Sequence, residues 1–245
     1  MTQQQAVCGE ETETEKVREE AQSSSRRQKA AEYAKRVLVL VVGLAVMSFG
    51  VALSIRASLG TSPISGIPYV LNLISDLSVG TTTILVNVGI VLLQILLLRR
   101  RFRPIALLQI PVCILFGLLT DLALLCITNV QPAAYWAQWL ICLCGILLVA
   151  VGVSCEVAAN VTTLPGEGTV LVLCTLFPKA KFGYMKVAVD VSLVVIAASL
   201  SFLFLRGLQG VREGTVAAAI LVGLLAKLFN RALHPLTAKF FASEK

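Results

Sequence analysis

The sequence has few charged residues and a single histidine, and these scarcities exclude several classes of protein. Asp, Glu, Lys and Arg make up 14% of the 245 residues, whereas a soluble domain usually has about 25%. The one histidine is His234, and no CxxC pair accompanies it, so no metal-site spacing is present. The chain also lacks GxSxG, HExxH and P-loop signatures. We therefore expect no metal, no cofactor and no enzymatic activity.

Apolar residues dominate what remains. They make up 57% of the chain, and the mean hydropathy is +0.84. Half of the 14 acidic residues lie in the first 32 positions, so the rest of the chain has too little polar surface to cover a globule in water. Lipid is the solvent that fits. We read the net charge of +7 as the Lys/Arg excess of cytoplasmic loops, and we expect no nucleic-acid partner.

Six apolar runs are long enough to cross a bilayer as helices. The first has 19 residues, which span roughly 30 Å at about 1.5 Å per residue. Two further pieces, residues 64–77 and 169–177, are too short to cross and follow breaks at Pro63 and Pro165. Such pieces are typical of broken or re-entrant helices. The six long runs are residues 37–55, 80–98, 104–127, 136–157, 183–205 and 214–229.

The two short pieces occupy matching places in an internal repeat. A shift of 102 residues aligns Pro63 with Pro165 and Gly66 with Gly168, and small insertions extend the match to the end of the last run. We therefore divide the chain into a disordered charged cytoplasmic tail (1–34), a first membrane repeat (35–132), a second membrane repeat (133–234) and a cytoplasmic C-terminal tail (235–245). A loose charged helix is the alternative for residues 1–34. Further aligned pairs are Gly43/Gly145, Gly50/Gly152, Ala57/Ala159, Gly80/Gly183, Asn87/Asp190 and Gly117/Gly223.

The Lys/Arg distribution favours six crossings over eight. With six, the arginines at 99–103 and Lys179 and Lys181 lie inside, whereas eight crossings would move the arginine run outside. Three crossings per repeat also insert the second repeat upside down relative to the first. We predict an all-α polytopic transmembrane bundle of two inverted repeats, each of three spans and one short broken or re-entrant helix. We expect it in the plasma membrane, with both termini cytoplasmic.

Two short motifs resemble those of a known family. Residues 57–63 read Ala-Ser-Leu-Gly-Thr-Ser-Pro, and Gly214-Thr215 opens the last run. These resemble the bacterial YczE/YyaS/YitT family of membrane proteins, in which an A-x-L-G-x-x-P signature follows the first span and a G-x-G-T pattern comes late. Arg212 replaces the first glycine of the second pattern, and the copy at 159–165 lacks the Leu-Gly. The resemblance covers most of residues 37–232 and implies a multi-pass membrane protein without naming a substrate.

Ionisable side chains inside the apolar runs are candidates for function because they are costly in lipid. Asp190 follows Lys186 by one helical turn, so the two either serve a solute or an ion or simply neutralise each other. Asn87 is the repeat counterpart of Asp190 and would offer a polar group from the opposite half. Asp121 either faces the bundle interior as a proton or cation site or is solvated near the outer interface.

Polar residues at the two breaks form a second group of candidates. Glu167 either lines a cavity or caps the second short helix, and capping is favoured. Ser62 and Ser65 either contact substrate or cap the first short helix, and again capping is favoured. Glu156 either serves function or is solvated at the membrane interface, and solvation is favoured. Arg56 either holds a substrate or extends its side chain to water, and the second is favoured.

Together these features favour a transporter or permease-like protein for a small polar solute. The substrate contacts would be Ser62, Ser65, Asn87, Glu167 and Asp190, and proton or ion coupling would use Asp121, Asp190 and Lys186. The alternative is a non-transporting membrane scaffold or accessory protein, for which Gly43, Ser48 and Gly50 would suit close packing with a partner helix. An intramembrane enzyme would need two facing carboxylates. A homo-oligomer stays open, and the lipid bilayer is the one partner that the sequence requires.

Overall fold

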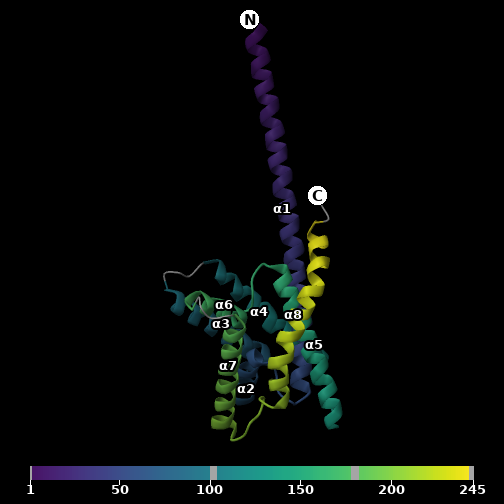
Figure 1. Cartoon of the computed structure of the whole chain (residues 1–245), viewed down its shortest axis with the longest axis vertical. Coiled ribbons are helices and arrows are strands. Elements are labelled where there is room, and N and C mark those ends of the chain that lie inside the picture. The colour runs from purple at the N-terminus through teal and green to yellow at the C-terminus, as the bar shows by residue number, and fades with distance from the viewer. Residues whose placement is uncertain (1, 100–103, 178–181, 243–245) are drawn as a thin grey trace.

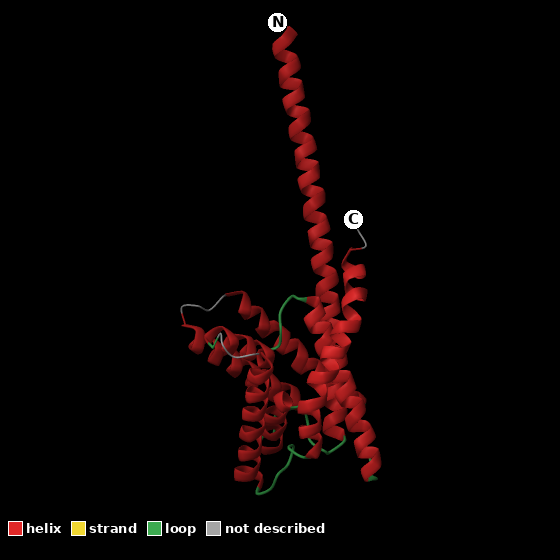
Figure 2. Ribbon diagram, in the orientation of Figure 1, coloured by secondary structure: helices red, strands yellow, loops and turns green. Residues whose placement is uncertain are grey.

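Helices form nearly all of the chain, shown here as a computed structural model that describes residues 2–99, 104–177 and 182–242 (Figure 1, Figure 2). No strand occurs in these three ranges. The helices are α1 (Thr2–Arg56), α2 (Pro63–Ile74), α3 (Val79–Leu98), α4 (Gln109–Cys126), α5 (Tyr135–Ala159), α6 (Pro165–Leu176), α7 (Phe182–Leu205) and α8 (Glu213–Ala242), with a 3-10 helix, η2 (Pro104–Leu108), before α4.

Six of the described helices are long and apolar enough to cross a membrane, which confirms the predicted all-α class. Their outward faces expose large apolar side chains such as Leu92 and Phe202, as contact with lipid requires. The crossing segments are Ala30–Arg56, Val79–Leu98, Ala106–Cys126, Tyr135–Ala159, Gly183–Leu205 and Glu213–Arg231.

The two short helices, α2 and α6, have 12 residues each. At about 1.5 Å per residue each spans about 18 Å, well short of the hydrocarbon thickness of about 30 Å. Both begin at the proline that we had placed before the helix, because Pro63 and Pro165 occupy a first-turn position where a missing N–H costs nothing. The breaks seen in the sequence are therefore the N-termini of these two helices.

Of the two states expected for the N-terminal segment, disorder or a charged helix, the structure has the helix: α1 is continuous from Thr2. Residues 2–34 are rich in Gln, Glu, Ala, Lys and Arg, which favour helix, and the membrane span below already supplies the nucleus. Arg36 adds an ion pair to Glu32 at 2.8 Å, one turn away. In the same way α8 continues to Ala242, through most of the expected C-terminal tail. Both termini lie at the same end of the bundle (Figure 1).

Helices α1 and α5 cross at four glycines. Gly43 lies against Gly152, and Gly50 lies against Gly145: a Cβ on Gly50 would sit 2.7 Å from the Gly145 carbonyl oxygen, and one on Gly43 would sit 3.1 Å from the Gly152 oxygen. The paired residues run in opposite order along the two helices, so α1 and α5 are antiparallel. Only glycine allows two backbones to approach this closely.

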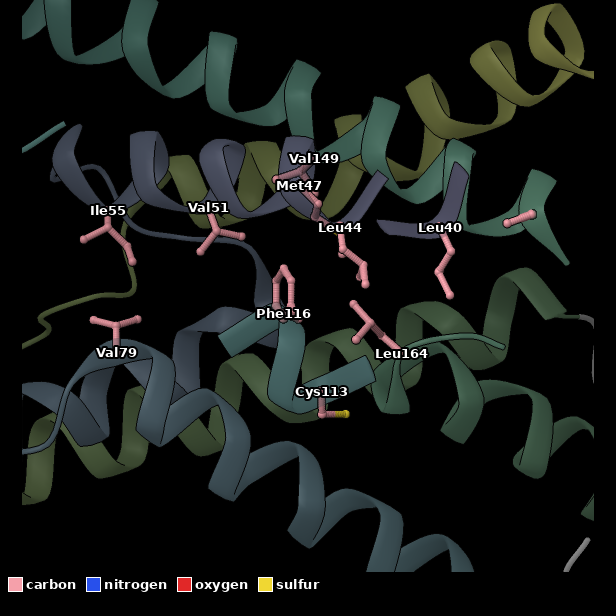
Figure 3. Close-up of a cluster of buried hydrophobic side chains, with 11 residues drawn as sticks. Leu40, Leu44, Met47, Val51, Ile55, Val79, Cys113, Phe116, Val149 and Leu164 are labelled. Atoms are coloured by element: carbon pink, nitrogen blue, oxygen red, sulfur yellow. The ribbon is translucent and has the colours of Figure 1, made fainter. Parts of the chain in front are cut away.

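An apolar stripe on α1 forms the largest buried cluster. Leu44, Met47 and Val51 recur three and four residues apart, so they share one face of the helix. Figure 3 shows this face directed at Phe116 of α4. The buried members of the cluster are Leu40, Leu44, Met47, Val51, Ile55, Val79, Cys113, Phe116, Val149, Ala159 and Leu164.

We expect Gly50→Ala to destabilise the protein by about 1–3 kcal/mol, because the added Cβ overlaps the backbone of α5. The matched control is Gly89→Ala, since a Cβ at Gly89 meets nothing within 4 Å; there the better helix propensity of alanine leaves stability equal or slightly higher. Thermal unfolding of both variants in detergent measures the difference. Equal melting temperatures would contradict the close crossing of α1 and α5.

Candidate functional site

A cavity of about 800 Å³ lies between helices of both halves of the chain. Apolar side chains, among them Met47, Val51 and Phe116, form much of its wall. Its volume falls in the range typical of small-molecule sites. The polar and charged side chains in the wall are Ser62, Ser65, Glu156, Glu167, Lys186, Asp190, Lys227 and Asn230.

The cavity brings together most of the residues that the sequence singled out. Ser62, Ser65, Glu167 and Asp190 line it, as does Lys186. They come from α6, α7 and the start of α2, which are far apart in the sequence and converge because the short helices return into the bundle. The structure therefore gathers these predicted contacts around one space.

Asn87 is the predicted substrate contact that lies elsewhere. It is buried in α3, with 1% of its surface exposed, and it is not among the residues that line the cavity. Its Oδ1 is buried and has no hydrogen-bond partner in the described part of the chain. Its place as the counterpart of Asp190 therefore does not bring it to the same space.

The N-termini of α2 and α6 meet beside the cavity. The side chain of Ile64 lies directly over Gly166, where a Cβ would be 2.6 Å from Ile64 Cδ1. Ile64 and Gly166 are themselves counterparts in the repeat, 102 residues apart. One contact therefore joins the same point of both short helices.

The serines at the start of α2 do not cap it with their side chains, so the favoured prediction is wrong. The N–H of Ser65 already donates to the backbone carbonyl of Ser62 at 3.0 Å. The Ser62 hydroxyl instead donates to the Ser65 hydroxyl at 3.1 Å, and both side chains reach the cavity wall. Glu167 likewise makes no capping hydrogen bond on α6 and lies in the wall.

Glu156 contradicts the prediction of a solvated interfacial residue. It is 1% exposed, and its carboxylate accepts the backbone N–H of Leu164 where the chain turns into α6. The reason is that the α5–α6 loop folds back over the end of α5. As an ionisable residue near the end of an apolar run, Glu156 carried a signal that could have marked it as functional. Lys227, inside the last run, carried the same signal.

Asp190 and Lys186 form the ion pair that their spacing predicts. Lys186 Nζ lies 3.2 Å from Asp190 Oδ1, and Asp190 is 7% exposed. The pair keeps each charge neutralised in a region with little water. The cavity wall thus contains a charge pair that a polar solute can compete for.

Asp121 lies outside the cavity, in α4 and beside the start of α3. Its Oδ2 accepts the Ser78 hydroxyl at 2.6 Å, and its Oδ1 accepts the Gly80 N–H at 2.6 Å. Arg56 also supports this end of the bundle, because its Nη2 donates to the carbonyl of Leu124 in the last turn of α4 at 3.3 Å instead of extending to water. Asp121 therefore acts as a helix cap joining α3 to α4.

The two family-like motifs meet at the end of the bundle opposite the termini (Figure 1). The Gly214 N–H donates to the Leu59 carbonyl at 2.8 Å, and Arg212 Nη1 donates to the Ser58 carbonyl at 3.2 Å. Gly60 has φ +101°, which favours glycine, and a Cβ there would be 2.3 Å from Thr215 Oγ1. The motifs thus hold the α1–α2 and α7–α8 loops together.

We expect Asp121→Ala to destabilise the protein by about 1–2 kcal/mol, because the Gly80 N–H loses its acceptor and α3 loses its bridge to α4, although Ser78 still caps α3 by accepting the Thr81 N–H. Asp121→Asn should lower the stability by less than Asp121→Ala, since the amide oxygen still accepts one N–H. Thermal unfolding measures both. If Asp121→Ala melted like the unsubstituted protein, the capping role would be excluded. The exposed loop residue Asp76, substituted by Ala, is the control.

Comparison with known proteins agrees with the predicted resemblance. The chain is 25% identical over 204 residues to the uncharacterized protein YyaS of Bacillus subtilis (strain 168), which covers 83% of this chain and 94% of that protein. It is 24% identical over 200 residues to an uncharacterized protein of Haemophilus influenzae, with 81% and 84% covered. No solved structure matches the chain. The model of a family of unknown function, DUF6198, matches residues 34–231, and the chain therefore belongs to that family.

Proposed function

We propose that this membrane protein is a transporter or permease-like protein that carries a small polar solute. The observation that supports it best is the cavity of about 800 Å³, in whose largely apolar wall several charged and polar side chains are gathered. Ionisable side chains inside a helix bundle are costly in lipid, which favours a functional role for this group. We further propose that the protein catalyses no reaction.

The contacts between the halves support an inverted repeat, the architecture of many secondary transporters. Helices α1 and α5 are repeat counterparts and run antiparallel, as two counterparts must when one repeat is upside down. A further pair of contacts has the same relation: a Cβ on Gly66 would be 3.5 Å from Ala197 Cβ, and one on Gly168 would be 3.2 Å from Gln94 Nε2. Residues 66 and 168, and 94 and 197, are offset by 102 and 103 positions.

We further propose that the protein lies in the plasma membrane. The end of the bundle that carries both termini would then face the cytoplasm. The sequence between α3 and α4 contains four arginines, which suits a cytoplasmic loop. Arg100, Arg101, Arg103, Lys179 and Lys181, on which this topology partly depends, lie outside the described residues.

The alternative role as a scaffold loses its main support. Gly43 and Gly50, which suited packing with a partner helix, are used within the chain against α5. Ser48 is also used internally, because its hydroxyl donates to the Phe116 carbonyl at 3.4 Å. The small-residue face of the first span is therefore not free to bind another protein.

We assign coupling to Asp190 with Lys186 and withdraw Asp121 from that role, because only the first two line the cavity.

Metabolite comparison between a deletion strain and its parent would identify the solute, and proteoliposome flux would follow it. We expect Asp190→Asn to lower the flux about tenfold or more, equal to a loss of about 1.4 kcal/mol. The control is Asp76→Asn, at an exposed loop residue. A solute carried equally well by Asp190→Asn would exclude the coupling, and failure to carry any solute would favour the scaffold.

A further inference from the structure

The charges that line the cavity are unequal. Three carboxylates face two ammonium groups, one of which, Lys227, is on an exposed part of α8. Asp190 is paired with Lys186 at 3.2 Å, and Glu156 is fully buried against the N–H of Leu164. The remaining carboxylate is that of Glu167.

Glu167 is half-buried, and its carboxylate makes no hydrogen bond or ion pair in the described part of the chain. Lys186 also attracts this carboxylate, but the Lys186 ammonium is already paired with Asp190 at 3.2 Å. A partly desolvated carboxylate that shares its counter-ion is stabilised by a further positive charge. An anionic ligand would meet this carboxylate in the first turn of α6, where it also offsets the positive end of the helix dipole. The charge of the wall therefore favours a cation.

The rest of the wall selects the body of the ligand. Met47, Val51, Phe116 and Val149 contribute apolar surface to the same wall as the polar residues at the start of the short helices. We infer that the cavity binds a small organic cation, an ammonium group on an apolar body, with Glu167 as its counter-ion. The inference rests on the proposed function and names the chemical class of its solute.

Three probes with one apolar body test this class: 3-phenylpropylammonium, 3-phenylpropanol and 3-phenylpropanoate. Calorimetric titration of the full chain in lipid nanodiscs should show the cation binding at least about tenfold tighter than the other two. Glu167→Gln should abolish that preference. Glu213→Gln, at an exposed carboxylate outside the cavity wall, should keep it.

The outcomes separate this inference from the proposed function. Tighter binding of the alcohol or the carboxylate would overturn the cationic class while leaving a carrier of another solute. Equal cation binding by Glu167→Gln would overturn the role of Glu167. If none of the three probes bound, the class would be wrong, and flux of another solute in proteoliposomes would still decide whether the protein is a carrier.

A second inference comes from two pairs of glycines. We call the line along which two neighbouring helices pack a seam. On the seam between α3 and α4, the backbones at Gly80 and Gly117 are in contact: a Cβ on Gly80 would be 2.2 Å from the Gly117 oxygen, and one on Gly117 would be 2.7 Å from the Gly80 oxygen. Asp121 adds its hydrogen bond to the Gly80 N–H. This seam is closed.

The counterpart seam, between α7 and α8, is open. Gly183 and Gly223 are the repeat counterparts of Gly80 and Gly117, yet a Cβ on either would meet nothing within 4 Å. Both glycines line the cavity, which therefore reaches between α7 and α8. The same pair of helices is thus packed in one half and separated in the other.

Glycine within a helix costs about 0.8–1 kcal/mol relative to alanine, and nothing in this conformation requires it at Gly183 or Gly223. If α7 packed against α8 as closely as α3 packs against α4, that conformation would require glycine at both Gly183 and Gly223. We infer that the two seams alternate, so that Gly183 meets Gly223 as Gly80 separates from Gly117. This inference also rests on the proposed function, because it supplies the movement that exchanges access to the cavity.

Disulfide cross-linking tests the closure. The double variant Gly183→Cys/Gly223→Cys is oxidised in membranes, and the linked peptide is identified by mass spectrometry, so the native cysteines do not interfere. We expect the 183–223 link to form, because a disulfide needs Cβ atoms about 3.5–4.5 Å apart. Gly89→Cys/Gly223→Cys is the control, since Gly89 does not line the cavity. Absence of the link, or equal linking of the control pair, would overturn the inference.

A single substitution gives an independent check. Gly223→Val should melt like the unsubstituted protein, because its side chain enters open space here, yet it should prevent closure and so the 183–223 approach. Flux of an identified solute should then fall at least about tenfold, while Gly89→Val leaves it unchanged. Normal flux through Gly223→Val would overturn the inference that the two seams alternate, and it would leave the proposed carrier role intact. Absence of flux in the unsubstituted protein and in both variants would count against the carrier role.

Discussion

The close crossing of α1 and α5 is the constraint on which the other positions depend. Two backbones meet at Gly43, Gly50, Gly145 and Gly152, and the apolar stripe on α1 packs against α4. Because α1 and α5 run antiparallel, their crossing sets the opposite directions in which the chain continues after each of them. The α2 and α6 helices then leave the crossing from opposite ends and return toward one another.

Length is the second constraint. A 12-residue helix cannot cross the hydrocarbon, so α2 and α6 each leave one polar end inside the bundle, where lipid cannot satisfy the free N–H groups. The Ile64–Gly166 contact brings these two ends together, and the serines of α2 and the carboxylate of Glu167 are carried with them to the cavity. The polar site is thus a consequence of two helices that stop short.

Much of this arrangement could be predicted because it depends on composition and spacing. Run length gave six spans, and the Pro/Gly breaks gave two short helices within a few residues of their ends. Tertiary contacts were beyond such reasoning: the fold of the α5–α6 loop onto Glu156, and the capping of α3 by Asp121 from another helix, join residues 8 and 41–43 positions apart. For the N-terminal segment the sequence left disorder and a charged helix as alternatives, because a composition rich in Glu, Gln, Lys and Arg is common to both.

The cavity has one further property, which concerns how its charge is divided between the halves. The ionisable residues that α5, α6 and α7 contribute all have neutral, buried counterparts in the first half. The Lys186–Asp190 pair carries no net charge, so among these residues a voltage across the membrane acts chiefly on the carboxylates of Glu156 and Glu167, both in the second half of the chain. The counterpart pairs are Glu156/Ser54, Glu167/Ser65, Lys186/Thr83 and Asp190/Asn87.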